Sequence, residues 1–168
     1  MESEELTKQK QRLIERLGVH IERKDQFAPL AARIMSTLVL TGKKGCCFDT
    51  LVADLSASKS TVSTHLNNLQ QGHRISYYTK CGDRKKYFIM HPDSMVIKMD
   101  EMVDTWEKEK ELHLEIMEYK KQLNKNLPED DDSKFELEFH TDYLLFLEQA
   151  SASIQRLREK LTTKIKED

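Results

Sequence analysis

The sequence is short of the residues on which most catalytic sites depend. It has only 5 glycines in 168 residues. None of them belongs to a phosphate-binding loop or to the glycine pattern of a dinucleotide-binding fold. The nucleophile motif GxSxG and the zinc-protease motif HExxH are also absent. We therefore expect no catalytic residues and no cofactor, and we do not expect the chain to be an enzyme.

Cysteine is equally scarce, with 3 residues and no CxxC pair. Cys46 and Cys47 are adjacent, a poor geometry for a bridge between them, and Cys81 stands alone. We therefore expect neither a disulfide framework nor a zinc site, and reduced cysteines favour a cytoplasmic location. The charged N-terminus lacks the apolar segment of a signal peptide, and no apolar run approaches the ~20 residues of a membrane span.

Metal and redox sensing are minor alternatives. The six histidines do not pair with each other or with cysteine at metal-ligand spacing on one predicted helix face, so we expect no metal ligands. Cys81 is the best redox candidate, since Lys80, Arg84 and Lys85 nearby would favour its thiolate, although an inert exposed cysteine is the simpler interpretation. The acidic run at 130–132 has the character of a solvated connector.

Charge is unevenly distributed along a chain whose formal net charge is only -2. Residues 1–55 carry a net +1, residues 56–90 a net +5 and residues 91–168 a net -8. A basic middle segment beside an acidic tail indicates a local surface for anions. The charged fraction of 33% and hydrophobic fraction of 38% suit a helical protein with a modest core, which a dimer would enlarge.

Apolar periodicity divides the chain into three parts. Residues 1–26 hold an amphipathic helix that we expect to dimerise, with a stop at Gly18. Residues 27–91 contain a nearly all-apolar helix from Pro29 to Gly42, the turn KKGCC, a short helix FDTLVADL, a helix from Lys59 to Gln71 and a β-hairpin. That order predicts a mainly α winged helix-turn-helix.

Residues 92–168 predict a long helical hairpin with dimerisation and effector-binding roles. Met95, Met99, Met102 and Trp106 form an apolar stripe that resumes at Leu112 after a one-residue slip, so one long helix is expected. The stripe is read as packing, with a ligand pocket as the alternative. The segment NLPEDDDS should end this helix, and a second apolar stripe from Tyr143 to Ile165 predicts another.

The helix beginning at Lys59 sorts its side chains in an unusual way. On a helical wheel Val62, Leu66 and Leu69 face inward, and Ser58 is placed to cap the N-terminus. No acidic residue occurs between Ser56 and Gly82. Short polar groups allow close approach to base edges and phosphates, which a carboxylate would repel. The expected major-groove residues are Lys59, Ser60, Thr61, Ser63, Thr64, Asn67 and Asn68.

The predicted hairpin concentrates positive charge at its tip. Lys80, Arg84, Lys85 and Lys86 surround the turn at Gly82 and Asp83. We expect these cations to contact DNA phosphates, and the alternative is that they only protect a sheet edge from aggregation.

The run from LAARIMSTLVLTG through LSASKSTVSTHLNNL to the hairpin GDRKKYF resembles MarR-type winged-helix regulators, in particular their GbsR-like branch. The resemblance covers residues 27–92. It implies a bacterial homodimer that binds a pseudo-palindromic operator in double-stranded DNA, with Lys59–Gln71 as recognition helix and residues 79–86 as wing. It also implies a repressor released by a small-molecule effector, whose site is unknown. His73-Arg74 departs from the family pattern before the first strand.

We therefore predict a cytoplasmic, homodimeric, sequence-specific DNA-binding transcriptional regulator. The competing interpretation is a winged-helix module that binds protein through its acidic helical tail.

Overall fold

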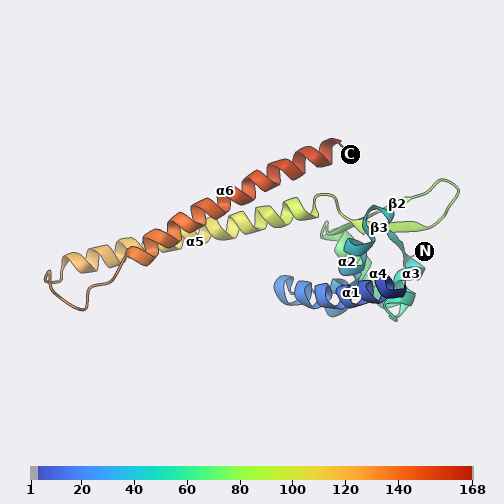
Figure 1. Ribbon diagram of the computed structural model, residues 1–168, viewed down its shortest axis with the longest axis horizontal. Coiled ribbons are helices and arrows are strands. Elements are labelled where there is room, and N and C mark those ends of the chain that lie inside the picture. Colours follow the sequence, from blue (N-terminus) through green and yellow to red (C-terminus); the bar gives the residue numbers. More distant parts are fainter. Residues whose placement is uncertain (1–3, 168) are drawn as a thin grey trace. The chain divides into compact units, whose positions relative to one another are not determined.

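A computed structural model of the chain describes residues 4–167 (Figure 1). The chain divides into two compact units, the first ending at Ser94 and the second beginning at Met95. The first unit contains α1 (Glu4–Asp25), α2 (Pro29–Thr41), the 3-10 turn η1 (Gly42–Lys44), β1 (Cys46–Cys47), α3 (Phe48–Asp54), α4 (Lys59–Gln71), β2 (Ile75–Thr79) and β3 (Lys86–Met90). The second contains α5 (Ser94–Lys125) and α6 (Glu138–Glu167). The first unit is a winged helix-turn-helix, as predicted.

The centre of the first unit is α2, the most apolar helix. Ala32, Ile34 and Leu38 are fully buried, which confirms the prediction that this helix would be enclosed. The ring of Pro29, at the first position of α2, fixes φ near its helical value. The helix ends at Gly42, which has a positive φ of 65°. Each fully buried aliphatic side chain of this kind stabilises the fold by about 1.5–3 kcal/mol. Inward residues of α3, α4 and the sheet complete the core: Leu51, Val62, Leu66, Leu69, Ile75 and Phe88.

The sheet has three antiparallel strands in the order β1-β3-β2. The sequence predicted only the hairpin of β2 and β3, and KKGCC was expected to be a turn. In the structure Cys46 pairs with Phe88, and Cys47 pairs with Tyr87. A side chain at Gly45 would meet the carbonyl oxygen of Phe88 at 2.8 Å, so glycine is what lets this strand approach β3.

Helix α1 passes through Gly18 and continues to Asp25, so the predicted stop at Gly18 is wrong. Gly18 is buried, and a Cβ there would lie 2.9 Å from Cδ of Arg33 on α2. The Arg33 guanidinium donates to Glu22 at 2.6 Å and to Glu15 at 3.4 Å, which joins the two helices. These contacts raise the pKa of Arg33, chiefly through the Glu22 hydrogen bond. Gly18 therefore serves helix packing.

The second unit is a hairpin of two long helices that run side by side in opposite directions (Figure 1). The one-residue slip in the apolar stripe leaves α5 continuous, as predicted, and the helix ends at Lys125, ahead of Pro128. Polar contacts join the pair along its length. Arg158 donates to Asp100, the Tyr143 hydroxyl donates to Glu109 at 2.6 Å, and the Asn124 side chain pairs with the backbone of Phe135.

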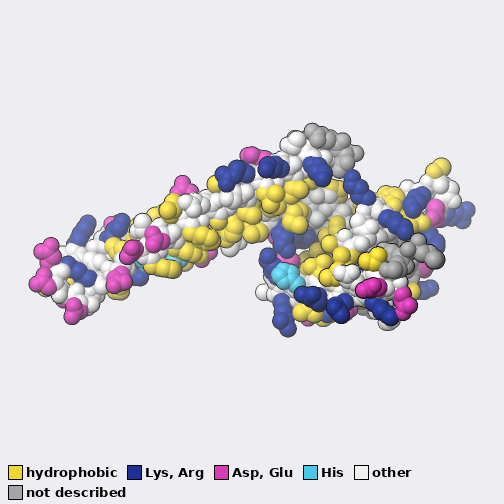
Figure 2. All heavy atoms as spheres, in the orientation of Figure 1, with side chains coloured by type: hydrophobic (Ala, Val, Ile, Leu, Met, Phe, Trp, Pro, Cys, Tyr) yellow, Lys and Arg dark blue, Asp and Glu magenta, His cyan; other side chains and the backbone are white. Residues whose placement is uncertain are grey.

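Much of the hairpin's apolar surface is left uncovered within one chain. Met99 and Leu147 are buried, but Figure 2 shows hydrophobic side chains gathered in a band along α5 and α6. Within residues 4–167, none of the helices combines the length and apolar character needed to cross a membrane.

Candidate nucleic-acid interface

Helix α4 follows α3 through a tight turn that sets the angle between the two. Ser56 has a positive φ of 49°, and the amide of Ala57 donates to the carbonyl oxygen of Val52 at 3.2 Å. Ser58 then caps α4, since its hydroxyl oxygen accepts from the Thr61 amide at 3.1 Å. This is the capping role predicted from the sequence. The turn therefore orders the N-terminus of α4 before any partner binds.

The inward and outward faces of α4 are those expected from the wheel. Val62, Leu66 and Leu69 are buried in the core. The seven residues predicted to enter a major groove are all exposed: Lys59, Ser60, Thr61, Ser63, Thr64, Asn67 and Asn68. Along α4 the structure thus presents one exposed surface with a single charged side chain, Lys59, and no acid.

Hydrogen bonds at the start of α4 limit what its hydroxyls can offer a partner. The Ser58 hydroxyl lies 2.6 Å from that of Thr61 and 3.0 Å from that of Ser60, so it forms hydrogen bonds with both hydroxyls. Thr64 donates its hydroxyl proton to the carbonyl oxygen of Ser60 at 3.0 Å. In this arrangement Thr64 offers an acceptor and a methyl group. Asn67 retains both donor and acceptor, as adenine readout requires.

Asp83 organises the turn of the β2-β3 wing. Its carboxylate accepts from the Lys85 amide at 2.9 Å and from the Tyr87 hydroxyl at 2.7 Å. The Tyr87 hydrogen bond and then the Lys85 amide lower the pKa of Asp83. Gly82 takes the positive φ of 77° that the turn needs. Asp83 therefore acts as a turn residue.

The four basic residues of the wing are all exposed, but they fall into two pairs. The Lys80 ammonium lies 4.0 Å from the ring centroid of Tyr87, and that of Lys86 lies 4.2 Å from Tyr77. Arg84 and Lys85 occupy the turn itself, beyond the strands. Lys80 and Lys86 are thus held against aromatic rings by cation–π contacts. Arg84 and Lys85 extend the positive charge to the tip.

His73 and Arg74 form the junction between α4 and β2. His73 has a positive φ of 52° and its ring stacks edge-on against His91. Arg74 places its guanidinium over the ring of Phe27 at 5.8 Å. Its amide donates to Leu69 at 2.9 Å, and its carbonyl oxygen accepts from His91 at 2.9 Å. These contacts fix the direction in which the wing leaves the helix.

The three cysteines lie in different environments. Burial is the main cause that raises the pKa of Cys46 to about 11, which fits its role in the core. Cys47 is half-buried, and hydrogen bonds from Thr50, with the charge of Lys85, lower the pKa of its thiol. Cys81 is exposed on the wing, as predicted. Sequence reasoning did not single out Cys47, because the proximity of Lys85 depends on the pairing of β1 with β3.

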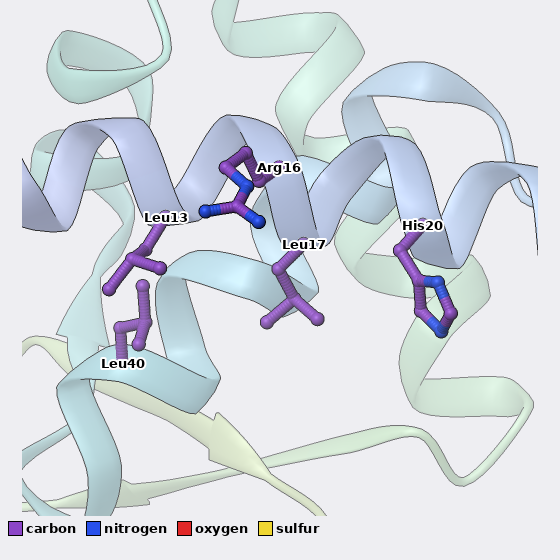
Figure 3. Close-up of a pocket in the computed structure, with 5 residues that line it drawn as sticks. All are labelled: Leu13, Arg16, Leu17, His20 and Leu40. Carbon is purple, nitrogen blue, oxygen red and sulfur yellow. The ribbon is translucent and has the colours of Figure 1, made fainter.

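An open hollow of about 490 Å³ lies on the first unit between α1 and α2 (Figure 3). Leu17 and Leu40 form apolar walls with Leu13, while Arg16 and His20 supply its polar groups. The sequence analysis predicted no site here. Across residues 4–167, no cluster of three or more His, Cys, Asp or Glu side chains is arranged to hold a metal ion.

Several solved structures resemble this chain at low sequence identity. One is described as a transcriptional regulator, with 16% identity over 95% of this chain and 97% of that one, and a TM-score of 0.48. A MepR mutant from a multidrug-resistant S. aureus clinical isolate has 17% identity over 92% of this chain and 99% of its own, with a TM-score of 0.41. A second S. aureus MepR mutant has 17% identity over 96% and 99%, with a TM-score of 0.42. No protein-family model and no curated protein sequence matches the chain.

Proposed function

We propose that this protein is a sequence-specific regulator of transcription that binds duplex DNA as a homodimer. The observation that carries the proposal is the exposed face of α4. It bears short hydrogen-bonding side chains and one lysine, with no carboxylate, on a capped helix whose opposite face is anchored in the core. Such a helix can enter a major groove closely, and its N-terminus favours phosphates. Asn67 and Thr64 are the residues proposed to read bases.

The wing adds the second element of the proposed DNA interface. It carries four exposed cations, and Asp83, the acid among them, has both carboxylate oxygens engaged in the turn. Arg84 and Lys85 at the tip would contact phosphates, while Lys80 and Lys86 would add to the positive electrostatic potential of the wing. These contacts would supply affinity rather than sequence preference.

Homodimerisation is supported by apolar side chains that one chain leaves exposed. Phe139 is 66% exposed, Tyr119 63%, and Leu112 and Phe146 each 55%, all on the hairpin of α5 and α6. On α1, Leu6 is 53% exposed. Exposed apolar patches of this kind mark interaction surfaces. A second copy would bury them and give the two-fold symmetry that a pseudo-palindromic operator mirrors.

We also propose that binding represses transcription and is released by a small effector. Support comes from the resemblance of residues 27–92 to MarR-type regulators of the GbsR-like branch. The hollow of Leu13, Arg16, Leu17, His20 and Leu40 is a candidate position for such an effector, as apolar walls with a few polar groups are typical of ligand sites.

Selection of bound duplexes from a random library tests this function directly. The expected product is a palindromic site whose half-sites lie about one helical turn apart. Asn67→Asp should lower affinity for that site about tenfold or more, because a carboxylate would face phosphates and base acceptors. Asn126→Asp, the same isosteric change on the connector after α5, should leave affinity unchanged. Recovery of no enriched site, together with binding of a protein partner through the hairpin, would favour the interaction-module interpretation.

A further inference from the structure

Two histidines that are distant in sequence meet inside the hairpin of α5 and α6. His113 on α5 and His140 on α6 place their Nδ1 atoms 3.1 Å apart. The Nε2 atom of His140 lies 3.0 Å from the ammonium nitrogen of Lys120, which follows His113 on α5. His140 is only 6% exposed. We call these three residues the histidine cluster. The spacing of the histidines in the sequence did not predict the histidine cluster, and the cluster has no part in the proposed DNA interface.

The hydrogen bonds of the histidine cluster dictate where its protons lie. A lysine ammonium only donates, so Nε2 of His140 must be the acceptor and carry no proton. Neutral His140 then carries its proton on Nδ1, where it donates to Nδ1 of His113. His113 must therefore be neutral too, with its proton on Nε2. The arrangement is complete only when both rings are uncharged.

The neighbours of the histidine cluster oppose a positive charge on it. Lys120 from α5 already supplies one cation, and its ammonium lies 5.3 Å from the ring centroid of Phe135. From α6, Tyr143 packs its ring 4.7 Å from that of His113 and donates its hydroxyl to Glu109 of α5. The carboxylate of Glu109 is thus engaged by the Tyr143 hydroxyl. Burial, then Lys120 and His113, lower the pKa of His140.

We propose that the histidine cluster is a pH-sensitive switch that holds the connector end of the hairpin closed while both rings are neutral. A proton on Nε2 of His140 would point at the Lys120 ammonium, and a proton on Nδ1 of His113 would point at the Nδ1–H of His140. Either event replaces a hydrogen bond by two facing donors and adds like charge. Acidification therefore opens the contact between the start of α6 and residues 113–120 of α5.

The direction of the pH effect follows from the linkage between proton binding and hairpin opening. His140 has a lowered pKa in the closed hairpin, so the open form binds the proton more readily. The closed form is fully favoured above the ordinary histidine pKa of about 6.5 and loses stability as the pH falls below it. If His140 is protonated only in the open form, it raises the opening equilibrium about tenfold between pH ~7.5 and ~5.5.

Two measurements on the full chain test this switch. The first is a ¹⁵N NMR titration of the imidazoles. We expect His140 as the Nδ1–H tautomer and His113 as the Nε2–H tautomer at about pH 8, with the pKa of His140 below the ordinary histidine value of about 6.5. A His140 that titrates at or above the ordinary histidine pKa, or that carries its proton on Nε2, would overturn the proposal without any variant.

The second measurement is hydrogen exchange by mass spectrometry, with each rate divided by its intrinsic rate at that pH. Protection of α6 residues 138–146 should fall about tenfold or more between pH ~7.5 and ~5.5, while protection of α2 stays constant. In a His113→Gln, His140→Gln double variant, whose amides bond without titrating, α6 protection should not depend on pH. The control His65→Gln, a change on α4 outside the hairpin, should keep the wild-type pH dependence of α6 protection. Equal pH dependence in the double variant and the wild type would refute the switch.

Discussion

The wing allows the proposed DNA interface to be tested on charge alone. Arg84→Ala combined with Lys85→Ala removes the two tip cations. The turn should survive, because Asp83 is held by the backbone amide of Lys85 and by the Tyr87 hydroxyl, and neither group is changed. Both altered side chains are exposed, so the free energy of unfolding should change by less than about 0.5 kcal/mol. Any loss of binding then reports on lost charge.

The size of the expected effect comes from counterion release. Each phosphate contact contributes about 0.9 to the slope of log K against log salt concentration. A fourfold rise in salt, from ~50 to ~200 mM, therefore costs about 3.5-fold in affinity for each contact. Removal of two contacts should lower the slope by about 1.8 and reduce the salt effect about 12-fold. The loss should be similar on random and selected duplexes, because phosphates carry no sequence information.

Fluorescence anisotropy with a labelled duplex at several salt concentrations measures this slope. The matched control is Lys121→Ala with Lys125→Ala, which removes the same charge from exposed positions on α5. The control should keep the wild-type slope within about 0.3, whereas net-charge effects alone would lower both variants equally. An unchanged slope in the Arg84 and Lys85 variant would show that the wing does not contact phosphates.

Three further predictions concern individual side chains. Ser58→Ala removes the cap on α4 and should lower the free energy of unfolding by about 1 kcal/mol, measured by urea titration. Leu147→Ala leaves a cavity between α5 and α6, and because this side chain is 1% exposed it should cost about 2–5 kcal/mol, whereas Leu145→Ala at 53% exposure should cost much less. Iodoacetamide at about pH 8 should modify Cys47 and leave Cys46 unmodified, because Cys46 is buried with its pKa raised to about 11 while the Cys47 pKa is lowered. Peptide mass spectrometry distinguishes the two sites, and equal labelling would contradict the burial of Cys46.

Local pattern was enough to predict the part of the chain that forms the candidate interface. The 3.6-residue period of Val62, Leu66 and Leu69 determines which face of α4 is buried, since burial of apolar area dominates the choice. Ser58 was recognisable as the cap, and Gly82 with Asp83 as the turn. These features depend on neighbours within a few positions. The domain boundaries at 26 and 91 and the DNA contacts stay predictions.

Features that depend on distant residues could not be read from the sequence. Gly18 has the pattern of a helix stop, and only the position of Arg33 on α2 shows that it is a packing residue inside α1. β1 exists because Gly45 lets two residues reach β3. Most plainly, His113 and His140 are 27 positions apart and lie on separate helices. Helical periodicity places each residue on a face of its own helix, but the register between two packed helices is set by all the contacts along them together. The sequence alone therefore determined the winged helix and its polar face. The tertiary structure decided which side chains of α5 and α6 meet, and thus that His113, His140 and Lys120 form hydrogen bonds with one another.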